Sequence, residues 1–352
     1  MAPANSFQVY RKTVIITGGS RGMGLAVAHK LAAKGANVVI VARDKDKLRE
    51  GIAYVKKGAL DPEIQRFHSI SADLALASEA VRVVDEVLLW NSNVAPDITL
   101  QVWCCAGSSY PTLFVDTPVS EFSTQMNNNY FTSLYMAHAI LKCWLKGSRK
   151  GQFAAPTTVP YKSGIEPTSQ PTSRHIIFTA SFLAFYSFAG YAAYSPSKAA
   201  LRSLSDSLSQ EMNLYAAAYP KEPRVRLHTI FPSGILTDSY EAENRVKCDL
   251  TKLLEEGDKV QTADIVASKS IKALESGQEL ITTDFQTRLV KGSMLGGSIR
   301  GGVFRGLGDY IIAILLTIVM IFVRADHDKK VRNWGSQFGA SGMRGSNGVA
   351  QA

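Results

Sequence analysis

A tyrosine and a lysine four residues apart, Tyr194 and Lys198, have the types and spacing that proton transfer needs. On a helix this spacing places both side chains on one face. An ammonium group near a phenol favours the phenolate and lowers the phenol pKa from ~10, so Tyr194 could donate a proton near neutrality. Ser181, thirteen residues before the tyrosine, could hold a carbonyl oxygen. Each residue alone would also fit a structural role, but the joint spacing predicts reduction of a carbonyl group.

A glycine-rich segment at residues 17–24 could hold a phosphate group. Its sequence is Thr-Gly-Gly-Ser-Arg-Gly-Met-Gly, and it lies between a β-branched run and a helical pattern. Gly18, Gly22 and Gly24 would let the backbone approach a pyrophosphate, while the amide groups of the new helix favour its negative charge. A glycine-rich turn can also be purely structural. The position of this one, between the first strand and the first helix of a βαβ unit, predicts dinucleotide binding.

The residues after the second β-branched run indicate which dinucleotide binds. A cofactor with a free ribose 2′-hydroxyl calls for Asp or Glu at this point, but the chain has Arg43 followed by Asp44. The guanidinium group of Arg43 can bind a 2′-phosphate through two hydrogen bonds, and Arg21 could reach the same phosphate. We therefore predict NADPH as the cofactor. The alternative is a loop that turns the Asp44 carboxylate toward the ribose instead.

A parallel sheet with helices on both faces would position these residues, and the hydrophobic pattern predicts one. Short β-branched runs alternate with helical spacing from residue 13 to residue 283, which is the order of an α/β fold. The predicted strands are Thr13–Thr17, Asn37–Ala42, Arg66–Ser71, Leu100–Cys104, His175–Thr179, Arg224–Phe231 and Glu279–Thr283. The predicted helices are residues 25–34, 45–56, 78–90, 121–146, 197–215 and 263–275. We expect a Rossmann-type, doubly wound, parallel seven-stranded sheet.

Composition excludes several classes of protein. Hydrophobic residues make up 46% of the chain and charged residues 20%, so neither wholesale disorder nor a protein with many membrane spans is expected. The four cysteines show no CxxC or Cys/His spacing, which argues against a metal site or a disulfide framework. The net charge of +9 is concentrated after residue 285, where nine Lys and Arg face three Asp. We therefore expect no nucleic-acid partner for the catalytic domain.

Taken in chain order, residues 17–24, Asn129, Ser181, Tyr194 and Lys198 resemble the short-chain dehydrogenase/reductase family, over residues 10–285. The resemblance implies that Tyr194 protonates the substrate oxygen, Ser181 orients it, and Lys198 tunes Tyr194 and holds the nicotinamide ribose. It also implies that Asn129 anchors a water relay. The cofactor contacts that it implies are Gly18, Ser20, Arg21, Gly22, Gly24, Arg43, Asp73, Leu74, Ala106, Gly107, Tyr194, Lys198, Pro232, Gly234, Ile235 and Thr237.

One segment departs from the family pattern. The family usually has Asn-Asn-Ala-Gly after the fourth strand, whereas this chain has Cys104-Cys105-Ala106-Gly107. The adjacent cysteines are expected to be buried strand residues. The departure puts in doubt the bracing between strands that the asparagine would provide, but not the chemistry.

An apolar run near the C-terminus, Tyr310–Val323, has no charged residue and covers ~21 Å as a helix against the ~30 Å of a bilayer core. It could span a membrane, with help from residues 303–308, or only embed in one. A buried core helix is the alternative. We predict a basic, apolar membrane-anchoring segment at residues 286–332 with its core at 310–323. Residues 333–352 are expected to be a disordered polar tail, and residues 147–174 a flexible insertion.

The substrate follows from context. The segment Ala193–Leu204, the element Asn129-Tyr130-Phe131 and the apolar C-terminal segment together resemble the fungal 3-ketodihydrosphingosine reductases. This resemblance implies NADPH-dependent reduction of a long-chain keto lipid, 3-ketodihydrosphingosine, at the endoplasmic reticulum membrane, with the catalytic domain facing the cytosol. Membrane lipids would be partners, and a homo-oligomer is left open. The alternatives are a membrane-bound hydroxysteroid or retinoid dehydrogenase and a non-catalytic dinucleotide sensor.

The family resemblance also implies a substrate lid after the nicotinamide segment, which in this chain is the loop Asp238–Lys259. Its apolar residues Tyr240, Leu250, Leu253 and Leu254 are candidates for lining an acyl-chain path.

Overall fold

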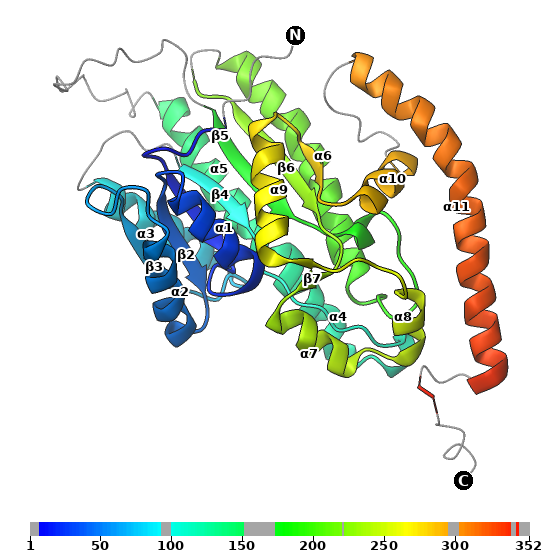
Figure 1. Ribbon diagram of the computed structural model, residues 1–352. Helices are drawn as coiled ribbons and strands as arrows, with labels where there is room; N and C mark the ends of the chain where they lie inside the picture. Colours follow the sequence, from blue (N-terminus) through cyan, green and yellow to red (C-terminus); the bar gives the residue numbers. More distant parts are fainter. Residues whose placement is uncertain are drawn as a thin grey trace.

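The computed structural model describes residues 7–92, 100–150, 173–219, 222–294, 303–338 and 343–344. Its centre is a parallel sheet of seven strands in the order β3-β2-β1-β4-β5-β6-β9 (Figure 1). The strands are β1 Thr13–Thr17, β2 Asn37–Ala42, β3 Phe67–Ser71, β4 Leu100–Cys104, β5 Arg174–Thr179, β6 Val225–Phe231 and β9 Leu280–Thr282. All seven predicted strands are confirmed, and each boundary agrees to within one residue. A small second sheet pairs β7 Ile235–Leu236 with β8 Gln261–Thr262.

The order of the strands reverses at β1, which pairs with β2 on one side and with β4 on the other. From β1 the chain winds outward through β2 and β3, then returns to the middle of the sheet and winds the other way. Loops at the carboxyl ends of β1 and β4 therefore part from each other, and in open α/β sheets this point is where ligands bind. The glycine-rich segment follows β1 at this point.

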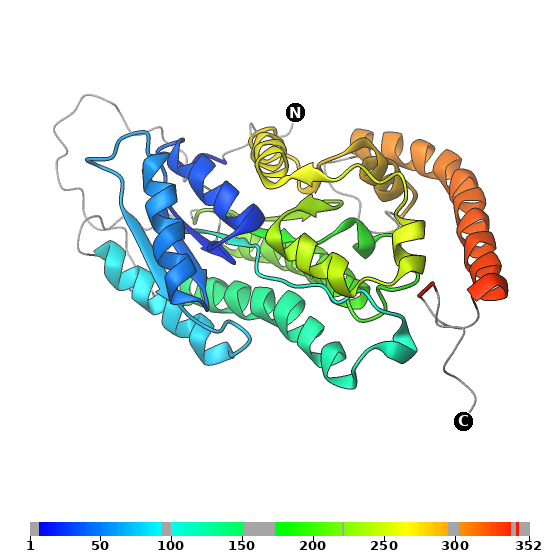
Figure 2. The same cartoon turned by 60° about the horizontal axis from the view of Figure 1, so that its bottom comes forward.

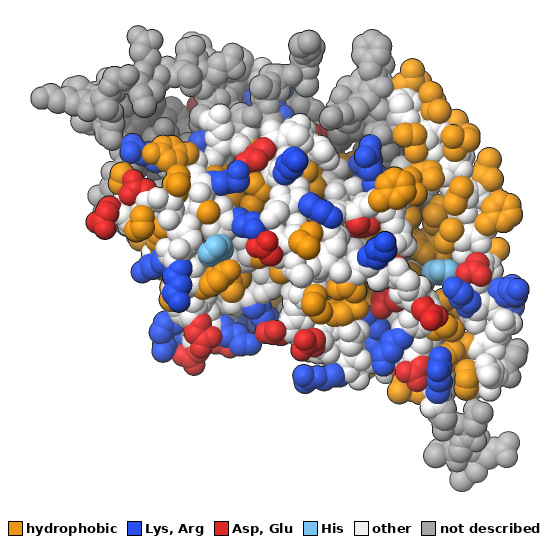
Figure 3. All heavy atoms as spheres, viewed as in Figure 1, with side chains coloured by type: hydrophobic (Ala, Val, Ile, Leu, Met, Phe, Trp, Pro, Cys, Tyr) orange, Lys and Arg blue, Asp and Glu red, His pale blue; other side chains and the backbone are white. Residues whose placement is uncertain are grey.

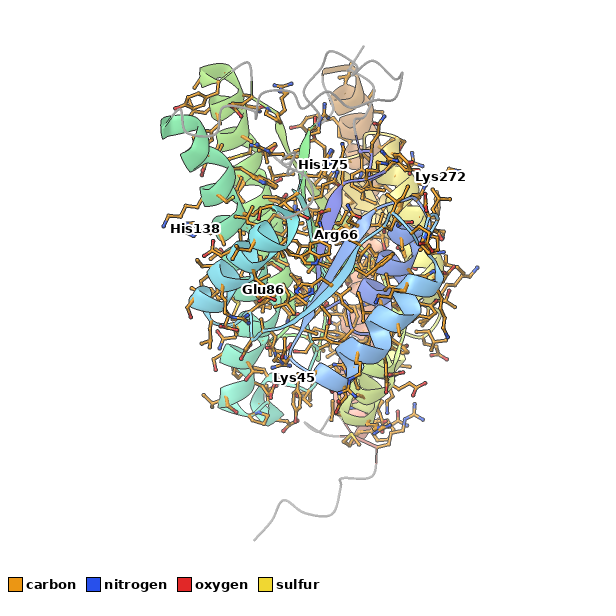
Figure 4. The ribbon with its side chains drawn as sticks, turned by 90° about the vertical axis from the view of Figure 1, so that its left-hand side faces the viewer. Lys45, Arg66, Glu86, His138, His175 and Lys272 are labelled. Atoms are coloured by element: carbon orange, nitrogen blue, oxygen red, sulfur yellow. The ribbon has the colours of Figure 1, made fainter. Side chains whose placement is uncertain are left out.

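Helices cover both faces of the sheet, as Figures 2 and 4 show. One face packs against α1 Gly22–Ala32, α2 Lys45–Lys57 and α9 Ala263–Glu275, and the other against α3 Ala77–Ser92, α5 Thr132–Lys150 and α6 Ser195–Ala218. Figure 4 looks along the sheet from the β3 edge, with His138 of α5 on one side and Lys272 of α9 on the other. The β1 side chains alternate accordingly: Ile15 packs with the second group of helices, Val14 and Ile16 with the first. Burial on both faces explains the nearly continuous hydrophobic runs of the central strands.

Shorter helices fill the connections at the carboxyl edge. They are η1 Phe114–Asp116, α4 Val119–Met126, η3 Phe182–Ala184, α7 Asp238–Val246, α8 Asp249–Leu254 and α10 Phe285–Ser293. The predicted helix at residues 121–146 is confirmed as helical throughout, but it is not one regular α-helix. A π-helical turn, η2 Asn127–Phe131, separates α4 from α5. Its buried Asn129 side chain bonds to the backbone of Ser108 and to Gln125. These bonds hold an irregular turn that apolar spacing alone could not reveal.

The insertion predicted at residues 147–174 is shorter at both ends. Helix α5 continues to Lys150, and β5 begins at Arg174. The rest of the predicted insertion, residues 151–172, lies outside the described residues.

The C-terminal apolar run belongs to one long helix, α11 Val303–Phe338, which lies along α10 and α8 beyond the β9 edge of the sheet (Figures 1 and 2). The polar tail was predicted to begin at residue 333, but the helix continues five residues further. Trp334 is only 4% exposed because it packs against Leu250 and Leu254 of α8, and Phe338 packs beside it. These contacts explain why the last turns are ordered. Residues 339–342 and 345–352 lie outside the described residues.

A single stripe of α11 faces the catalytic domain. The residues of this helix that are at least partly buried between 313 and 338 include Ala313, Leu316, Met320, Val323, His327, Val331, Trp334 and Phe338. They recur every three or four residues, which is the spacing of one helix face. Met320 packs near Phe182 and Tyr186, and the His327 ring lies against Tyr186 and Phe188. We call these eight residues the docking stripe.

The opposite side of α11 is apolar in its first half and charged in its second. Ile314, Leu315, Ile318 and Phe322 are each more than half exposed, whereas the outward residues after 323 include Arg324, Asp326 and Lys329. Figure 3 shows hydrophobic side chains over the first half of the helix and charges over the second. Within the described residues, Gly306–Gly335 is the one helix long and apolar enough to cross a membrane, by length and composition alone.

Candidate active site

The structure brings all the predicted site residues to one cavity at the carboxyl edge of the sheet. The cavity has a volume of about 790 Å³ and extends from the glycine-rich segment to α7 and the start of α10. Its wall includes Gly18, Ser20, Arg21, Gly22, Gly24, Arg43, Asp73, Leu74, Ala106, Gly107, Asn129, Ser181, Tyr194, Lys198, Pro232, Gly234, Ile235 and Thr237. Residues from eight separate segments of the chain thus meet where the strand order reverses.

The glycine-rich turn is too tight for side chains. Gly18 has a positive φ of 64°, and a Cβ atom there would lie 2.8 Å from the Ala106 nitrogen. A Cβ atom on Gly24 would lie 2.4 Å from the Gly18 carbonyl oxygen. Without side chains at these positions, the backbone and the first turn of α1 are open to the cavity. Such a cradle fits the pyrophosphate of a dinucleotide, which needs close approach to amide groups and to a helix N-terminus.

Three positively charged side chains lie at the end of the cavity beyond β2. Arg21, Arg43 and Lys47 all line it there. The carboxylate of Asp44 accepts hydrogen bonds from the backbone nitrogens of Asp46, at 3.0 Å, and Lys47, at 3.1 Å, and so caps α2. The bond from Lys47 is the largest cause that lowers the Asp44 pKa. One oxygen of the Asp44 carboxylate, Oδ1, is therefore engaged as a helix cap, while Asp44 also lines the cavity. Lys47 was not predicted, since a lysine on an amphipathic helix gives no sequence signal of its own.

Thr17 and Thr179 brace the wall where the family has asparagine. The Thr17 hydroxyl accepts hydrogen bonds from the backbone nitrogens of Cys105 and Ala106, at 3.2 and 3.3 Å. The Thr179 hydroxyl lies 3.5 Å from the Cys105 sulfur. Cys104 is buried at the end of β4, whereas Cys105 follows the strand and faces the cavity, so the expectation of two strand residues holds only for Cys104. Hydroxyl groups on the neighbouring strands replace the expected amide.

Tyr194, Ser181 and Lys198 meet at the centre of the cavity. Ser181 follows β5, and its hydroxyl accepts a hydrogen bond from the Leu183 nitrogen at 3.2 Å. Tyr194 is the N-cap residue of α6, and Lys198 lies one turn into that helix. The Lys198 ammonium donates to the Thr179 carbonyl oxygen at 3.0 Å and lies 5.6 Å from the centre of the Tyr194 ring. The geometry is that of a phenol with a serine hydroxyl on one side and a buried cation on the other.

The pKa values of this group differ from the sequence expectation. Burial raises the pKa of Tyr194, the charge of Glu243 raises it further, and a hydrogen bond with Ser181 acts in the opposite direction. Burial lowers the pKa of Lys198 to about 8. The expected lowering of the phenol pKa by Lys198 is therefore not seen, because desolvation outweighs it and the ammonium is bonded to Thr179. A firmly protonated phenol is nevertheless the form that proton donation requires.

Asn129 lies fully buried behind Lys198. Its side-chain oxygen accepts from the Ser108 nitrogen at 3.0 Å, and its amide nitrogen donates to the carbonyl oxygens of Ser108 and Gln125, each at 2.9 Å. A Cβ atom on Gly107 would come within 2.6 Å of the Asn129 oxygen and 3.3 Å of the Lys198 nitrogen. Asn129 thus fixes the loop after β4, and Gly107 leaves the room that the lysine needs.

The segment after β6 closes the cavity from the other side. The Pro232 carbonyl oxygen accepts from the Phe182 nitrogen at 2.8 Å, and Thr237 caps α7 through its hydroxyl. Of the four apolar lid candidates, only Tyr240 lines the cavity. Leu250 and Leu254 are buried and, with Leu253, pack around Trp334. The prediction that these leucines line an acyl-chain path was wrong, because they hold α11 to the domain instead.

Three polar residues of the cavity were missed. Tyr191, Glu243 and Glu255 lie beside Tyr194 and are joined by hydrogen bonds. They come from three separate parts of the chain, so no local spacing connects them. The only signal was indirect, since two of them fall within the predicted lid.

The tight turn gives a test of the cradle. Gly24→Ala places a methyl group against the Gly18 carbonyl, so the turn must shift, and overpacking of this kind costs about 1–3 kcal/mol of folding free energy. The shift moves the backbone amides that would hold the pyrophosphate, so affinity for a nicotinamide dinucleotide should fall by roughly tenfold or more. Equilibrium binding measured by nucleotide fluorescence would show the change. Gly308→Ala is the matched control because a Cβ atom there meets nothing within 4 Å. Unchanged binding by Gly24→Ala would mean that the turn does not hold the dinucleotide.

Comparison with known proteins agrees with this geometry. Residues 12–154 and 165–247 match the short chain dehydrogenase family. The 3-ketodihydrosphingosine reductase of Aspergillus fumigatus is 46% identical over 95% of this chain and 88% of its own length. The 3-ketodihydrosphingosine reductase of Neurospora crassa is 36% identical over 95% of this chain and 85% of its own length. A short-chain dehydrogenase/reductase from Burkholderia phymatum, solved in complex with NAD, superposes with a TM-score of 0.61 at 15% identity, over 84% of this chain and 98% of its own. A short-chain type dehydrogenase/reductase from Mycobacterium ulcerans superposes with a TM-score of 0.60 at 21% sequence identity. The superposition covers 80% of this chain and 92% of that protein. This chain therefore belongs to the short-chain dehydrogenase family, an oxidoreductase family whose fold binds a nicotinamide dinucleotide.

Proposed function

We propose that this protein uses NADPH to reduce a long-chain keto lipid, 3-ketodihydrosphingosine, to dihydrosphingosine. The observation that carries the proposal is the joint presence of Ser181, Tyr194 and Lys198 in one cavity of a chain whose relatives, 46% and 36% identical over nearly its whole length, are named 3-ketodihydrosphingosine reductases. A non-catalytic dinucleotide sensor would have no need of this set. Hydroxysteroid and retinoid dehydrogenases would share it, so the substrate must be tested directly.

The residues divide the chemistry as follows. The Ser181 hydroxyl holds the substrate carbonyl oxygen, and the Tyr194 hydroxyl donates the proton to it. The Lys198 ammonium, which its pKa of about 8 leaves mostly charged at neutral pH, stabilises the phenolate that remains. NADPH would be held by the glycine-rich turn and by the wall at Ala106 and Gly107. When bound there, it would supply the hydride to the carbonyl carbon. The buried surroundings strengthen each of these electrostatic contacts.

The preference for NADPH rests on the cations beyond β2. Arg21, Arg43 and Lys47 line the end of the cavity where the adenosine ribose would lie, and Asp44 Oδ1 caps α2. A 2′-phosphate would find two guanidinium groups and an ammonium there.

Membrane attachment is proposed to occur through the first half of α11. The docking stripe faces the protein, so the apolar side chains on the other side of the helix would otherwise face water. An exposed apolar surface next to charged residues suits a lipid surface. Because the docking stripe continues to Trp334 and Phe338, both halves of the helix stay against the catalytic domain. We infer that α11 lies in one leaflet, at the cytosolic face of the endoplasmic reticulum, and that it does not span the bilayer.

The first test of the function is a substrate panel. Detergent-solubilised protein should oxidise NADPH with 3-ketodihydrosphingosine and not with steroid ketones or retinal. Tyr194→Phe should lower turnover by about 10²–10⁴-fold while NADPH binding is retained, because only the proton donor is removed. Tyr54→Phe, a half-exposed tyrosine outside the cavity, is the control. Turnover near wild type in Tyr194→Phe would contradict the proposed mechanism.

Cofactor choice can be tested separately. Arg43→Ala should raise the KM for NADPH by roughly 10- to 100-fold and change the KM for NADH little, since the lost hydrogen bonds join charged groups. Lys45→Ala removes a neighbouring charge that does not line the cavity and should leave both constants unchanged. Equal losses for the two cofactors would show that Arg43 does not bind the 2′-phosphate.

The attachment of α11 can be tested without disturbing the docking stripe. The triple change Ile314→Lys, Ile318→Lys and Phe322→Lys should move the protein from the membrane pellet to the soluble fraction after a carbonate wash, because each lysine opposes burial in lipid by about 2.5–3.5 kcal/mol. Reduction of a short, soluble ketone should continue. The control is Asn333→Lys with Gln337→Lys, both exposed in the charged half. A triple variant that still resists carbonate would place the anchor elsewhere.

A further inference from the structure

Four polar residues form a connected network next to the catalytic tyrosine. The Tyr191 hydroxyl lies 2.7 Å from Glu243 Oε1 and 2.5 Å from Glu255 Oε1, so the two carboxylates share its one proton. The Lys247 ammonium lies 3.0 Å from Glu243 Oε1 and 2.6 Å from Glu255 Oε2. We call these residues the Glu243 network. Except for Lys247, they line the cavity that holds Tyr194.

With both carboxylates ionised, the Glu243 network carries one negative charge more than the Lys247 ammonium neutralises; burial and the charge of Glu243 raise the pKa of Glu255. Two carboxylates share a single ammonium group, that of Lys247, whose side chain is 0% exposed. Burial alone would lower the Lys247 pKa, but the two carboxylates raise it, so the lysine stays charged. Burial and the same carboxylates raise the pKa of Tyr191, so the phenol stays neutral and acts only as a donor. The family chemistry of proton and hydride transfer gives no reason for an excess carboxylate here.

The excess charge is available on Glu243 rather than on Glu255. Both oxygens of Glu255 are engaged, one by Tyr191 and the other by Lys247. Both donors to Glu243 bind the same oxygen, Oε1. Within the part of the chain that the structure describes, Glu243 Oε2 has no hydrogen-bond partner, and the side chain is 15% exposed in the cavity wall. This oxygen can accept a hydrogen bond from a ligand.

Glu243 lies close to the reacting group. The ring of its partner Tyr191 packs at a tilt beside the ring of Tyr194, with 5.9 Å between the ring centres. Its charge also contributes to the raised pKa of Tyr194, and both side chains line the same cavity. A cation bound at Glu243 Oε2 would therefore lie in the same cavity as the Tyr194 hydroxyl, on the side where Tyr191 packs. The other charged groups on this side of the cavity are Asp258, Lys259 and Asp284, of which two are acidic.

We propose that Glu243 binds the ammonium group of an α-amino ketone and so selects the substrate. The inference rests on the proposed function, because 3-ketodihydrosphingosine carries a primary amine on the carbon next to its ketone. Bound amine would balance the excess charge of the Glu243 network. Steroid ketones and retinal carry no amine, and they would leave this carboxylate desolvated and unpaired, which is unfavourable. Glu243 is thus a specificity residue, held in place by Tyr191 and Lys247.

The experiment compares two ketones on three proteins in detergent micelles with NADPH. The ketones are 3-ketodihydrosphingosine and the same keto alcohol without the amine. Wild-type protein should prefer the amino ketone, and Glu243→Gln should lower kcat/KM for it by about 10- to 100-fold, the usual loss for a hydrogen bond between charged groups. For the ketone without the amine, Glu243→Gln should cause no loss of kcat/KM, because no ammonium group is there to lose its partner, and removal of the unpaired carboxylate can only favour this ketone. Glu241→Gln, an exposed carboxylate on the same helix α7, should behave as wild type with both ketones.

The outcomes separate this inference from the proposed function. Equal losses for both ketones in Glu243→Gln would overturn the inference and assign the carboxylate a structural role, while reduction of the keto lipid would stand. Wild-type protein that reduces neither ketone would overturn the proposed function itself. If Glu243→Gln fails to fold, the inference can still be tested on the wild-type protein with a modified substrate. Acetylation of the substrate amine removes its charge and should lower kcat/KM by the same 10- to 100-fold. Equal kcat/KM for the acetylated and free amines would overturn the inference.

Discussion

Burial of the Lys198 ammonium group is the constraint on which the site depends. The residue is 4% exposed, and a buried cation without a partner would cost several kcal/mol. Its partner is the Thr179 carbonyl oxygen, so the carboxyl end of β5 must lie directly beneath the first turn of α6. Gly107 must lack a side chain to leave room for the ammonium, and Asn129 must hold the loop that carries Gly107. The sheet register, the π-helical turn and the start of α6 are therefore fixed together by one charge.

The cavity carries opposite charges at its two ends. Arg21, Arg43 and Lys47 lie where a dinucleotide phosphate would bind, and the excess carboxylate of the Glu243 network lies where the substrate would bind. In a buried site such charges act over longer distances than in water. An anionic cofactor and a cationic substrate would each be attracted to its own end, and each repelled from the other. The electrostatics of the cavity therefore favour one orientation of the two ligands around Tyr194.

Hydrophobic patterns and short residue spacings in the sequence were enough to predict most of this fold. Strands such as β1 and β2 are buried on both faces, so their β-branched runs are unbroken and their ends were placed without error. The glycine-rich segment and the Tyr194 and Lys198 pair were found because their chemistry depends on short spacings. The π-helical turn at Asn127–Phe131 was missed because it is held by a bond to Ser108, about twenty residues away. The Glu243 network was missed for the same reason, since its members meet only in the folded chain.

The lid illustrates how tertiary contact overrides a reasonable local inference. Leu250 and Leu254 have the composition expected of an acyl-chain path, yet Trp334 of α11 covers them. Helix α8, which carries both leucines, lies between Lys247 and Glu255 in the chain, and its Thr251 hydroxyl donates to the Ala189 carbonyl oxygen at 3.1 Å, just before Tyr191. The surface that receives α11 is thus continuous with the residues that position Glu243. If α11 lies in a leaflet as proposed, the helix that contacts lipid also packs on α8, which helps to position Glu243. A lipid substrate would then enter the cavity beside α11.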